Sequence, residues 1–186
     1  MILFINACVR KESRTKRLAD CLLDILGEPF TEVCLKDIAF PVTDEEYLAK
    51  RDSLIAEGNF SDPMFALANQ FVAADRIVIA APHWDLSFPA SLKQYIENIN
   101  VVGITFKYTP EGVPVGLCKA KELYYVSSVG GNFAPEDYGF GYIKAMAQAY
   151  YGIGKVELIQ ACGLDLIGAD VEKILEECME RIANGK

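Results

Sequence analysis

A basic segment rich in hydroxyl groups follows the first apolar run of the chain. It spans residues 8–15, CVRKESRT, and its Ser13, Arg14 and Thr15 stand where a helical pattern begins. Backbone N–H groups at the start of a helix are free to bind an anion, and hydroxyl and guanidinium groups add further donors. Ser13 alone also fits a plain N-cap. Together, the residue types predict a phosphate-bearing ligand at this segment.

Two further segments follow apolar runs and have the composition of ligand-binding loops. The first lies between two prolines and holds the one tryptophan and the one histidine of the chain, in the order Pro82-His83-Trp84-Asp85-Leu86-Ser87-Phe88-Pro89. Prolines stiffen a loop, and a rigid loop with an aromatic plane suits a flat heterocycle with polar edges. Core filling by Trp84 is the alternative. The second, Ser128-Val129-Gly130-Gly131, allows close backbone approach, although a Gly-Gly pair also occurs in ordinary turns.

The common nucleotide loops and metal motifs are absent from the sequence. Neither G-x-G-x-x-G nor G-x-x-x-x-G-K-[ST] occurs, the six cysteines form no C-x-x-C pair, and only one histidine is present. We therefore expect no metal site and a set of reduced thiols. One spacing is an exception, because Cys8 and Arg14 match the C-x5-R-[ST] phosphate loop of low-molecular-weight tyrosine phosphatases, in which a thiolate attacks phosphorus. Against that alternative, the intervening residues contain no glycine.

Strands alternate with helices along the chain. The sequence predicts five strands, at residues 2–6, 31–35, 76–81, 122–128 and 155–161, of which 2–6 and 76–81 are apolar enough to be buried. Helical periodicity and caps predict helices at 13–27, 45–57, 62–73, 89–98, 141–151 and 169–182. This alternation is typical of right-handed βαβ crossovers and a parallel sheet covered on both faces. We therefore predict one α/β domain over residues 1–186, a three-layer sandwich.

The predicted sheet brings the three candidate segments together. In an open parallel sheet, ligands bind beyond the carboxyl ends of the strands. The segments that follow Asn6, Ala81 and Ser128 should therefore meet at one edge. One stretch departs from the alternation, because residues 105–108 and 113–115 flank Pro110-Glu111-Gly112 and predict an inserted β-hairpin.

Composition and charge narrow the class of partner. The 186 residues are 52% apolar with a net charge of −8, which excludes a disordered chain. No apolar run reaches the roughly 18 residues of a membrane span. Residues 1–17 hold five basic groups against Glu12, which leaves the other 169 residues at −12. A small anionic ligand fits this distribution better than a polyanion, so we expect a cytoplasmic protein with no membrane or nucleic-acid partner.

Longer stretches around these segments carry a family resemblance. They are ADRIVIAAPHWDLSFPASLKQYIENI, GITFKYTPEGVPVGL and SSVGG, all within residues 74–131, with Gly-Leu-Asp at 163–165. Here the sequence resembles the flavodoxin-like NAD(P)H-dependent FMN oxidoreductases, in particular the FMN-dependent NADH:quinone oxidoreductase and azoreductase group. The likeness covers most of the chain except residues 36–60. It implies a flavodoxin-like five-stranded parallel sheet with an inserted β-hairpin.

The resemblance also implies a cofactor site. Ser13, Arg14 and Thr15 match the residues that hold the FMN phosphate. The segment along the isoalloxazine ring is Pro82, His83, Trp84, Asp85 and Leu86, and the turn over its pyrimidine side is Ser128, Val129, Gly130 and Gly131. This sequence departs from the family pattern at three places, with Asn6-Ala7 for serines, Asp85 for asparagine and Val129 for a polar or basic residue.

The chemistry implied by the resemblance is a two-electron ping-pong transfer. NADH or NADPH would pass hydride to the flavin, and a quinone or an azo or nitro aromatic acceptor would then take the electrons in the same space. We expect no catalytic side chain, because the flavin carries the reaction. Phe106, Tyr108 and Phe133 are expected walls of an apolar acceptor slot, with core or dimer packing as the alternative. The resemblance further implies a homodimer with two active sites at its interface.

Two other functions stay open at this point. A flavodoxin-type electron carrier would bind FMN but dock a protein partner, and acidic charge fits such a carrier. The inserted hairpin favours direct use of NAD(P)H instead. A low-molecular-weight phosphatase that uses Cys8 and Arg14 is the more remote alternative.

Overall fold

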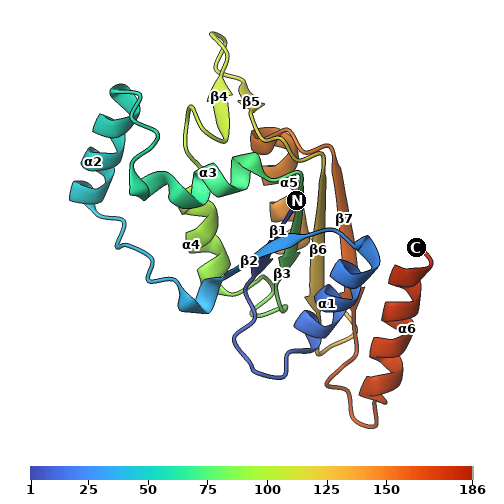
Figure 1. Ribbon diagram of the computed structural model, residues 1–186. Helices are drawn as coiled ribbons and strands as arrows, with labels where there is room; N and C mark the ends of the chain where they lie inside the picture. The colour runs from blue at the N-terminus through green and yellow to red at the C-terminus, as the bar shows by residue number, and fades with distance from the viewer. Residues whose placement is uncertain (186) are drawn as a thin grey trace.

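Five parallel strands form the centre of the computed structural model, which describes residues 1–185 (Figure 1). Their order across the sheet is β2-β1-β3-β6-β7, and every neighbouring pair is parallel. The strands are β1 (Ile2–Asn6), β2 (Phe30–Cys34), β3 (Arg76–Ala80), β6 (Glu122–Ser128) and β7 (Lys155–Ala161). The predicted five-stranded sheet is confirmed, with strand ends within one residue of the expected positions.

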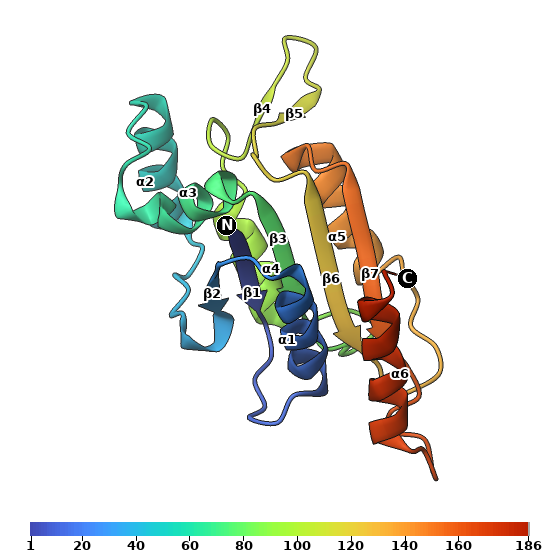
Figure 2. The ribbon, with the colours of Figure 1, turned by 45° about the vertical axis from the view of Figure 1, so that its right-hand side comes forward.

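Helices cover both faces of this sheet, because successive strand residues point to opposite sides. Leu3 and Ile5 of β1 belong to one apolar cluster, and Ile2 and Phe4 belong to the other. The first cluster is covered by α3 (Ala66–Ala73), α4 (Ala90–Ile99) and α5 (Phe140–Met146), and the second by α1 (Arg14–Leu26) and α6 (Val171–Ala183). Figure 2 shows α1 and α6 side by side on their face. The three-layer sandwich is confirmed.

Local hydrogen bonds explain where the helices begin and end. Ser13 caps α1 by accepting from the Lys16 backbone, and Gly27 ends the helix with a left-handed φ of 63°. Asp170 accepts from the Lys173 backbone, so α6 begins after it and not at the predicted residue 169. The predicted helix 141–151 is wrong in its second half, where Ala147–Tyr151 forms a π-helical turn after α5.

The region before β3 is built from shorter pieces. Leu35–Asp37 is a 3-10 turn, and α2 (Glu45–Ala56) follows with no fully buried residue. Asp62 accepts from the Met64 backbone, as its cap position predicts, but the first turn, Pro63–Phe65, is 3-10 and α3 starts only afterwards. None of the helices within residues 1–185 is both long and apolar enough to span a membrane.

The predicted hairpin is present and stands apart from the main sheet. It consists of β4 (Phe106–Tyr108) and β5 (Pro114–Gly116), which pair antiparallel. Figure 1 shows it beyond the amino ends of the strands, at the opposite end of the molecule from the loops that follow β1, β3 and β6. Gly116 lies directly against the backbone of Tyr151 and Gly152, where an added Cβ atom would overlap both residues. The hairpin is therefore anchored to the segment between α5 and β7.

Candidate functional site

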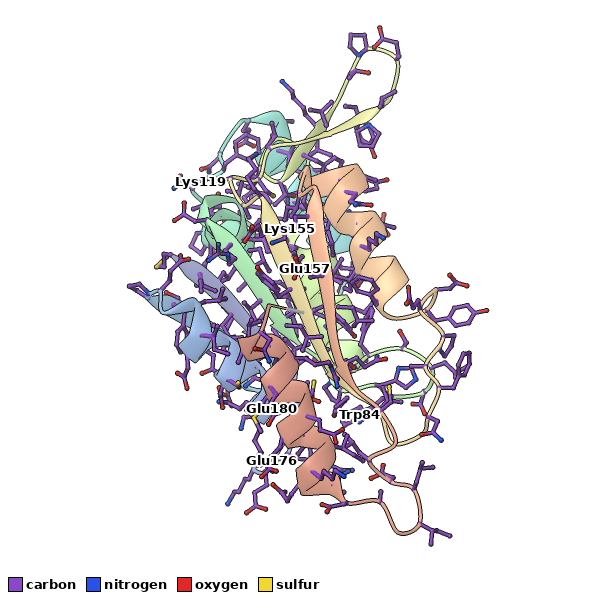
Figure 3. The ribbon with its side chains drawn as sticks, turned by 90° about the vertical axis from the view of Figure 1, so that its right-hand side faces the viewer. Trp84, Lys119, Lys155, Glu157, Glu176 and Glu180 are labelled. Atoms are coloured by element: carbon purple, nitrogen blue, oxygen red, sulfur yellow. The ribbon has the colours of Figure 1, made fainter. Side chains whose placement is uncertain are left out.

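The three predicted segments meet around one cavity at the carboxyl ends of the strands. Its volume is about 1010 Å³. It is lined by Val9, Arg10, Lys11, Glu12, Ser13, Arg14, Thr15, Lys16, Arg17, Asp20, Pro82, His83, Trp84, Ser128, Gly130, Leu164, Asp165, Val171 and Glu172. Figure 3 shows Trp84 at this end of the sheet and Lys119, which precedes β6, at the other. The size is that of a pocket for a cofactor-sized ligand.

The segment after β1 offers an unusually long row of free donors. The backbone N–H groups of residues 9–15 donate no hydrogen bond to any group within residues 1–185, whereas those of Cys8 and Lys16 on either side are bonded. These amides lead into the amino end of α1, where the helix dipole favours negative charge. Ser13 accepts a bond as N-cap, which leaves its hydroxyl hydrogen free to donate. Both predicted roles of Ser13 are thus compatible.

Thr15 has a different position from the one its sequence context suggests. Its side chain is fully buried, and its hydroxyl lies 2.6 Å from the Ser128 hydroxyl at the end of β6. This bond joins the start of α1 to the third segment. Thr15 therefore offers its backbone N–H to the cavity, while its side chain ties two walls of the cavity together.

The environment of Cys8 argues against its use as a phosphatase nucleophile. The residue is 3% exposed, and its Sγ lies 3.8 Å from the Ala80 carbonyl oxygen. Burial raises the pKa of the Cys8 thiol to about 11. A thiol with that pKa stays protonated at neutral pH, and the thiolate is the form that attacks phosphorus. Cys8 is also absent from the lining of the cavity described above.

The loop after β3 is a tight turn that presents Trp84. The backbones of Trp84 and Ser87 exchange two hydrogen bonds, of 3.2 and 2.7 Å. Asp85 and Leu86 between them have φ values of 49° and 66°, a left-handed region that aspartate tolerates but leucine rarely adopts. Trp84 is 38% exposed and lines the cavity. Asp85 and Leu86 lie beyond Trp84 and do not line it.

Hydrogen bonds hold this turn against the neighbouring segments. The His83 backbone donates to the Ser128 carbonyl oxygen (3.1 Å), and the Ser87 hydroxyl donates to the Tyr138 carbonyl oxygen (2.6 Å). Burial lowers the pKa of His83, so its imidazole is neutral at pH 7 and adds no charge to the cavity. Pro82 completes this wall. The loop is therefore fixed at both ends.

The turn after β6 is tied to a fourth segment, residues 163–165, which lies outside the three segments predicted from the sequence. Backbone N–H groups of Gly163, Leu164 and Asp165 donate to the carbonyl oxygens of Gly131, Val129 and Gly130, at 2.8 to 3.2 Å. The side chain of Val129 is buried, so the departure from the family pattern there adds no apolar surface to the cavity. The N–H groups of Gly130 and Gly131 donate to no group within residues 1–185.

Ion pairs reduce the positive charge that the sequence predicts here. Five basic and four acidic side chains line the cavity. Arg14 pairs with Asp165 (2.7 Å), Lys16 with Asp20 (2.7 Å) and Arg17 with Glu172 (2.8 Å). Of the five basic residues, only Arg10 and Lys11 have no acidic partner within residues 1–185. The acids of the fourth segment and of α6 come from more than 140 residues away in sequence, which is why the local pattern could not reveal them.

The three expected wall residues do not line this cavity. Phe106 and Tyr108 lie on the hairpin at the opposite end of the sheet, where Phe106 is buried against Tyr108 and Tyr150. Phe133 follows the Gly-Gly turn and is 76% exposed. Within one chain, Phe106 and Tyr108 therefore lie at the other end of the sheet from this cavity, because α4 returns the chain to the amino ends of the strands before the hairpin begins, and their role as walls of the acceptor slot stays a prediction. Within residues 1–185, no three metal-binding side chains form a cluster.

Comparison with known proteins agrees with this architecture. Residues 1–185 match the family model described as Flavodoxin-like fold. The chain is 36% identical to an FMN-dependent NADH:quinone oxidoreductase of Clostridium beijerinckii, in an alignment that covers 97% of this chain and 94% of that protein. It is 37% identical, with the same coverage, to FMN-dependent NADH:quinone oxidoreductase 2 of Clostridium acetobutylicum.

Solved structures share the fold at lower identity. An azoreductase from Bacillus anthracis superposes with a TM-score of 0.83 at 24% identity, over 99% of this chain and 97% of that chain. An FMN-dependent NADH-azoreductase from the same species, solved in complex with FMN, has a TM-score of 0.82 at 23% identity, over 99% and 96%. The family match and the two clostridial relatives each extend over nearly the whole chain. The chain belongs to the flavodoxin-like family, together with these FMN-dependent NADH:quinone oxidoreductases.

Proposed function

We propose that this protein is an FMN-dependent NAD(P)H oxidoreductase that reduces quinones or azo and nitro aromatic compounds. The observation that carries the proposal is the cavity that places the free amides of residues 9–15 and the exposed plane of Trp84 around one space. A phosphate and a flat ring are the two parts of FMN that need such partners. The names of the clostridial relatives support the same cofactor and the same class of acceptor.

The residues around the cavity fit FMN part by part. Ser13 and Arg14, with the amides up to Thr15, would hold the phosphate at the amino end of α1. Pro82, His83, Trp84, Asp85 and Leu86 form the loop along the ring, with Trp84 as its aromatic face. Ser128, Val129, Gly130 and Gly131 form the turn at the pyrimidine edge.

The protein's own contribution is to position and to stabilise charge. Bound FMN supplies the chemistry, because it accepts two electrons from a nicotinamide and releases them to an acceptor. The free N–H groups of Gly130 and Gly131 can donate to negative charge at the pyrimidine edge, and fixed donors of this kind need no reorganisation. The hydrogen bonds from the His83 backbone to Ser128 and from the Ser87 hydroxyl to Tyr138 hold the ring-side loop in place. No side chain is required as a general acid or base.

We also propose a cytoplasmic homodimer in which the hairpin of each chain completes the acceptor slot of the other. The hairpin carries exposed apolar side chains, among them Tyr108 at 49% exposure, Val113 and Val115. An apolar groove of about 700 Å³ beside α2 offers further surface to a second copy. In this arrangement Phe106 and Tyr108 would line the acceptor slot of the partner chain, which they do not reach within their own chain. Six free cysteines support a reducing compartment.

A spectral titration tests the cofactor and the donor. Purified protein is mixed with FMN, separated from free flavin by gel filtration, and titrated without oxygen by NADH and by NADPH before 1,4-benzoquinone is added. We expect a retained flavin spectrum that bleaches with at least one donor and returns with the quinone. Failure to retain or quench FMN would overturn the proposal. A retained flavin that neither donor reduces would indicate an electron carrier instead.

A second experiment tests the dimer. Light scattering after gel filtration should give twice the chain mass of 20.5 kDa. Tyr108→Ala should then raise the KM for the acceptor and leave the Kd for FMN unchanged, because in this arrangement Tyr108 lines the acceptor slot of the other chain and does not contact the segments that hold FMN. A monomer with unaltered turnover would refute the shared slot.

A further inference from the structure

Arg14 is held in place by the fourth segment before any ligand arrives. Its Nη1 donates to the carbonyl oxygen of Leu164 (3.2 Å) and to Oδ1 of Asp165 (2.7 Å). Both partners lie about 150 residues away in the sequence, on the segment after β7. The two hydrogens of Nη1 are thereby used.

The remaining edge of the guanidinium is free. Nε and Nη2 of Arg14 donate to no group within residues 1–185. These two nitrogens form the fork that binds two oxygens of a phosphate side by side. Ser13 and the free amides beside it lie at the same end of α1. Arg14 thus keeps a bidentate edge available in the part of the cavity where the anion donors gather.

The backbone of Asp165 is held by the turn after β6, while its side chain is 71% exposed. Its backbone N–H donates to the Gly130 carbonyl oxygen (2.9 Å), and its carboxylate lies directly over Gly130. A Cβ atom at Gly130 would come within 2.3 Å of Oδ2 of Asp165. The φ of Gly130 is not left-handed, and a side chain at this position would push the Asp165 carboxylate away from its present place. The turn that we assign to the pyrimidine edge therefore also positions the carboxylate that holds Arg14.

We propose that Asp165 is a positioning residue that presents Arg14 to the phosphate of FMN. This inference rests on the proposed function and adds a residue that acts through Arg14 without touching the cofactor. A competing interpretation predicts the opposite effect of removing Asp165 on FMN affinity. If the Asp165 carboxylate competed with phosphate for Arg14, its removal would tighten FMN binding. If it positions Arg14, its removal frees a long side chain that must be ordered again on binding.

The test compares FMN with riboflavin, which has the same ring and no phosphate. Quenching of flavin fluorescence by the apoprotein gives both Kd values for the natural protein, for Asp165→Ala and for Asp165→Asn. Measurements at 0.5 M salt reduce long-range repulsion between the carboxylate and the phosphate, since the Debye length is then only a few ångströms. We expect Asp165→Ala to weaken FMN binding about 3- to 10-fold. Riboflavin binding should stay unchanged, and Asp165→Asn, which keeps an acceptor oxygen, should restore part of the loss.

Two controls separate positioning from a general effect of charge or folding. Glu172→Ala removes another acid at the rim of the cavity, which pairs with Arg17 through two bonds of 2.9 and 2.8 Å. This variant should keep the ratio of the FMN Kd to the riboflavin Kd within about twofold of the natural protein's ratio. In an Arg14→Ala background, Asp165→Ala should have no further effect on that ratio.

Each other outcome has a definite meaning. A ratio that is unchanged in Asp165→Ala, or shifted towards tighter FMN binding, overturns the positioning role while the proposed function stands. Equal losses for FMN and riboflavin overturn it as well, because they indicate a merely structural residue. If the natural protein binds neither flavin, the proposed function itself fails, and the role of Asp165 fails with it.

Discussion

Replacing Gly116 by alanine tests how the hairpin is anchored. A Cβ atom at this position would lie 2.1 Å from the backbone nitrogen of Gly152 and 2.1 Å from the carbonyl carbon of Tyr151. Both are backbone atoms, so neither can rotate away. Normal contact distances between such atoms are about 3.5 Å, and the hairpin would have to move by roughly 1 Å or more.

The magnitude follows from the packing that this movement disturbs. Phe106 is buried against Tyr108 and Tyr150, with ring centroids 5.4 and 4.8 Å away. Overpacking of a buried contact costs about 1–3 kcal/mol. In a chain of this length each kcal/mol lowers Tm by about 2–4 °C, so we expect Gly116→Ala to melt roughly 2–12 °C lower.

Gly154→Ala is the matched control for this experiment. It lies on the same segment, nothing stands within 4 Å of its Cβ position, and its φ is not left-handed. Its Tm should be equal or slightly higher, because alanine lowers the entropy of the unfolded chain. Circular dichroism melts measure both variants, and FMN titration should show unchanged affinity in both. Equal melting temperatures would refute the packing interpretation, and a loss of FMN affinity in Gly116→Ala would refute the separation of hairpin and cavity.

Three further predictions concern single side chains. Burial keeps the Cys8 thiol protonated, with a pKa of about 11, so the native protein should not hydrolyse p-nitrophenyl phosphate. For the same reason, Cys8 should react with a disulfide reagent at pH 8 only when the protein unfolds. Steady hydrolysis that Cys8→Ser abolishes would contradict this prediction. Hydrogen bonds from Lys119 and the amino terminus lower the pKa of Asp75 to about 2, so the stability it contributes is present above pH 4 and lost as the pH falls from 4 towards 2. Asp75→Asn should flatten that part of a Tm-against-pH curve, and parallel curves would exclude the effect. Leu86→Gly should raise the free energy of unfolding by roughly 0.5–1 kcal/mol in urea titrations, because glycine relieves the φ of 66° at a largely exposed site; a lower midpoint would show that Leu86 is not strained.

Elements whose signals are local could be predicted from the sequence. β1 and β3 were predictable because each buries a short apolar run, and β1, β6 and β7 occur at the expected residues. The loops after β1, β3 and β6 could be assigned to one edge because parallel topology places them there. The π-helical turn at Ala147–Tyr151 could not be predicted, since apolar spacing does not distinguish it from a continuing α-helix.

The parts of the site that depend on contacts between distant residues could not be predicted from the sequence. Asp165 was visible only as part of a Gly-Leu-Asp match, and nothing in the sequence near Arg14 indicates its ion pair. The burial of Thr15 depends on Ser128, 113 residues away. Phe106 and Tyr108 were assigned to the slot by residue type, but only the chain path through α4 shows that they emerge at the other end of the sheet.

The backbone bonds between residues 129–131 and 163–165 have a consequence for the kinetics of cofactor exchange. They extend the pairing of β6 and β7 beyond the strands, so this turn can open only together with the sheet, which is the slowest kind of opening in a folded domain. Within residues 1–185, residues 9–12 make no hydrogen bond and can rearrange without breaking any, whereas Ser13, Arg14 and Thr15 are held by bonds of their own. We therefore expect FMN to enter and leave past the segment after β1, so that its phosphate binds last and is released first. Substitutions in that segment should change the rates of FMN exchange more than substitutions in the turn at residues 129–131.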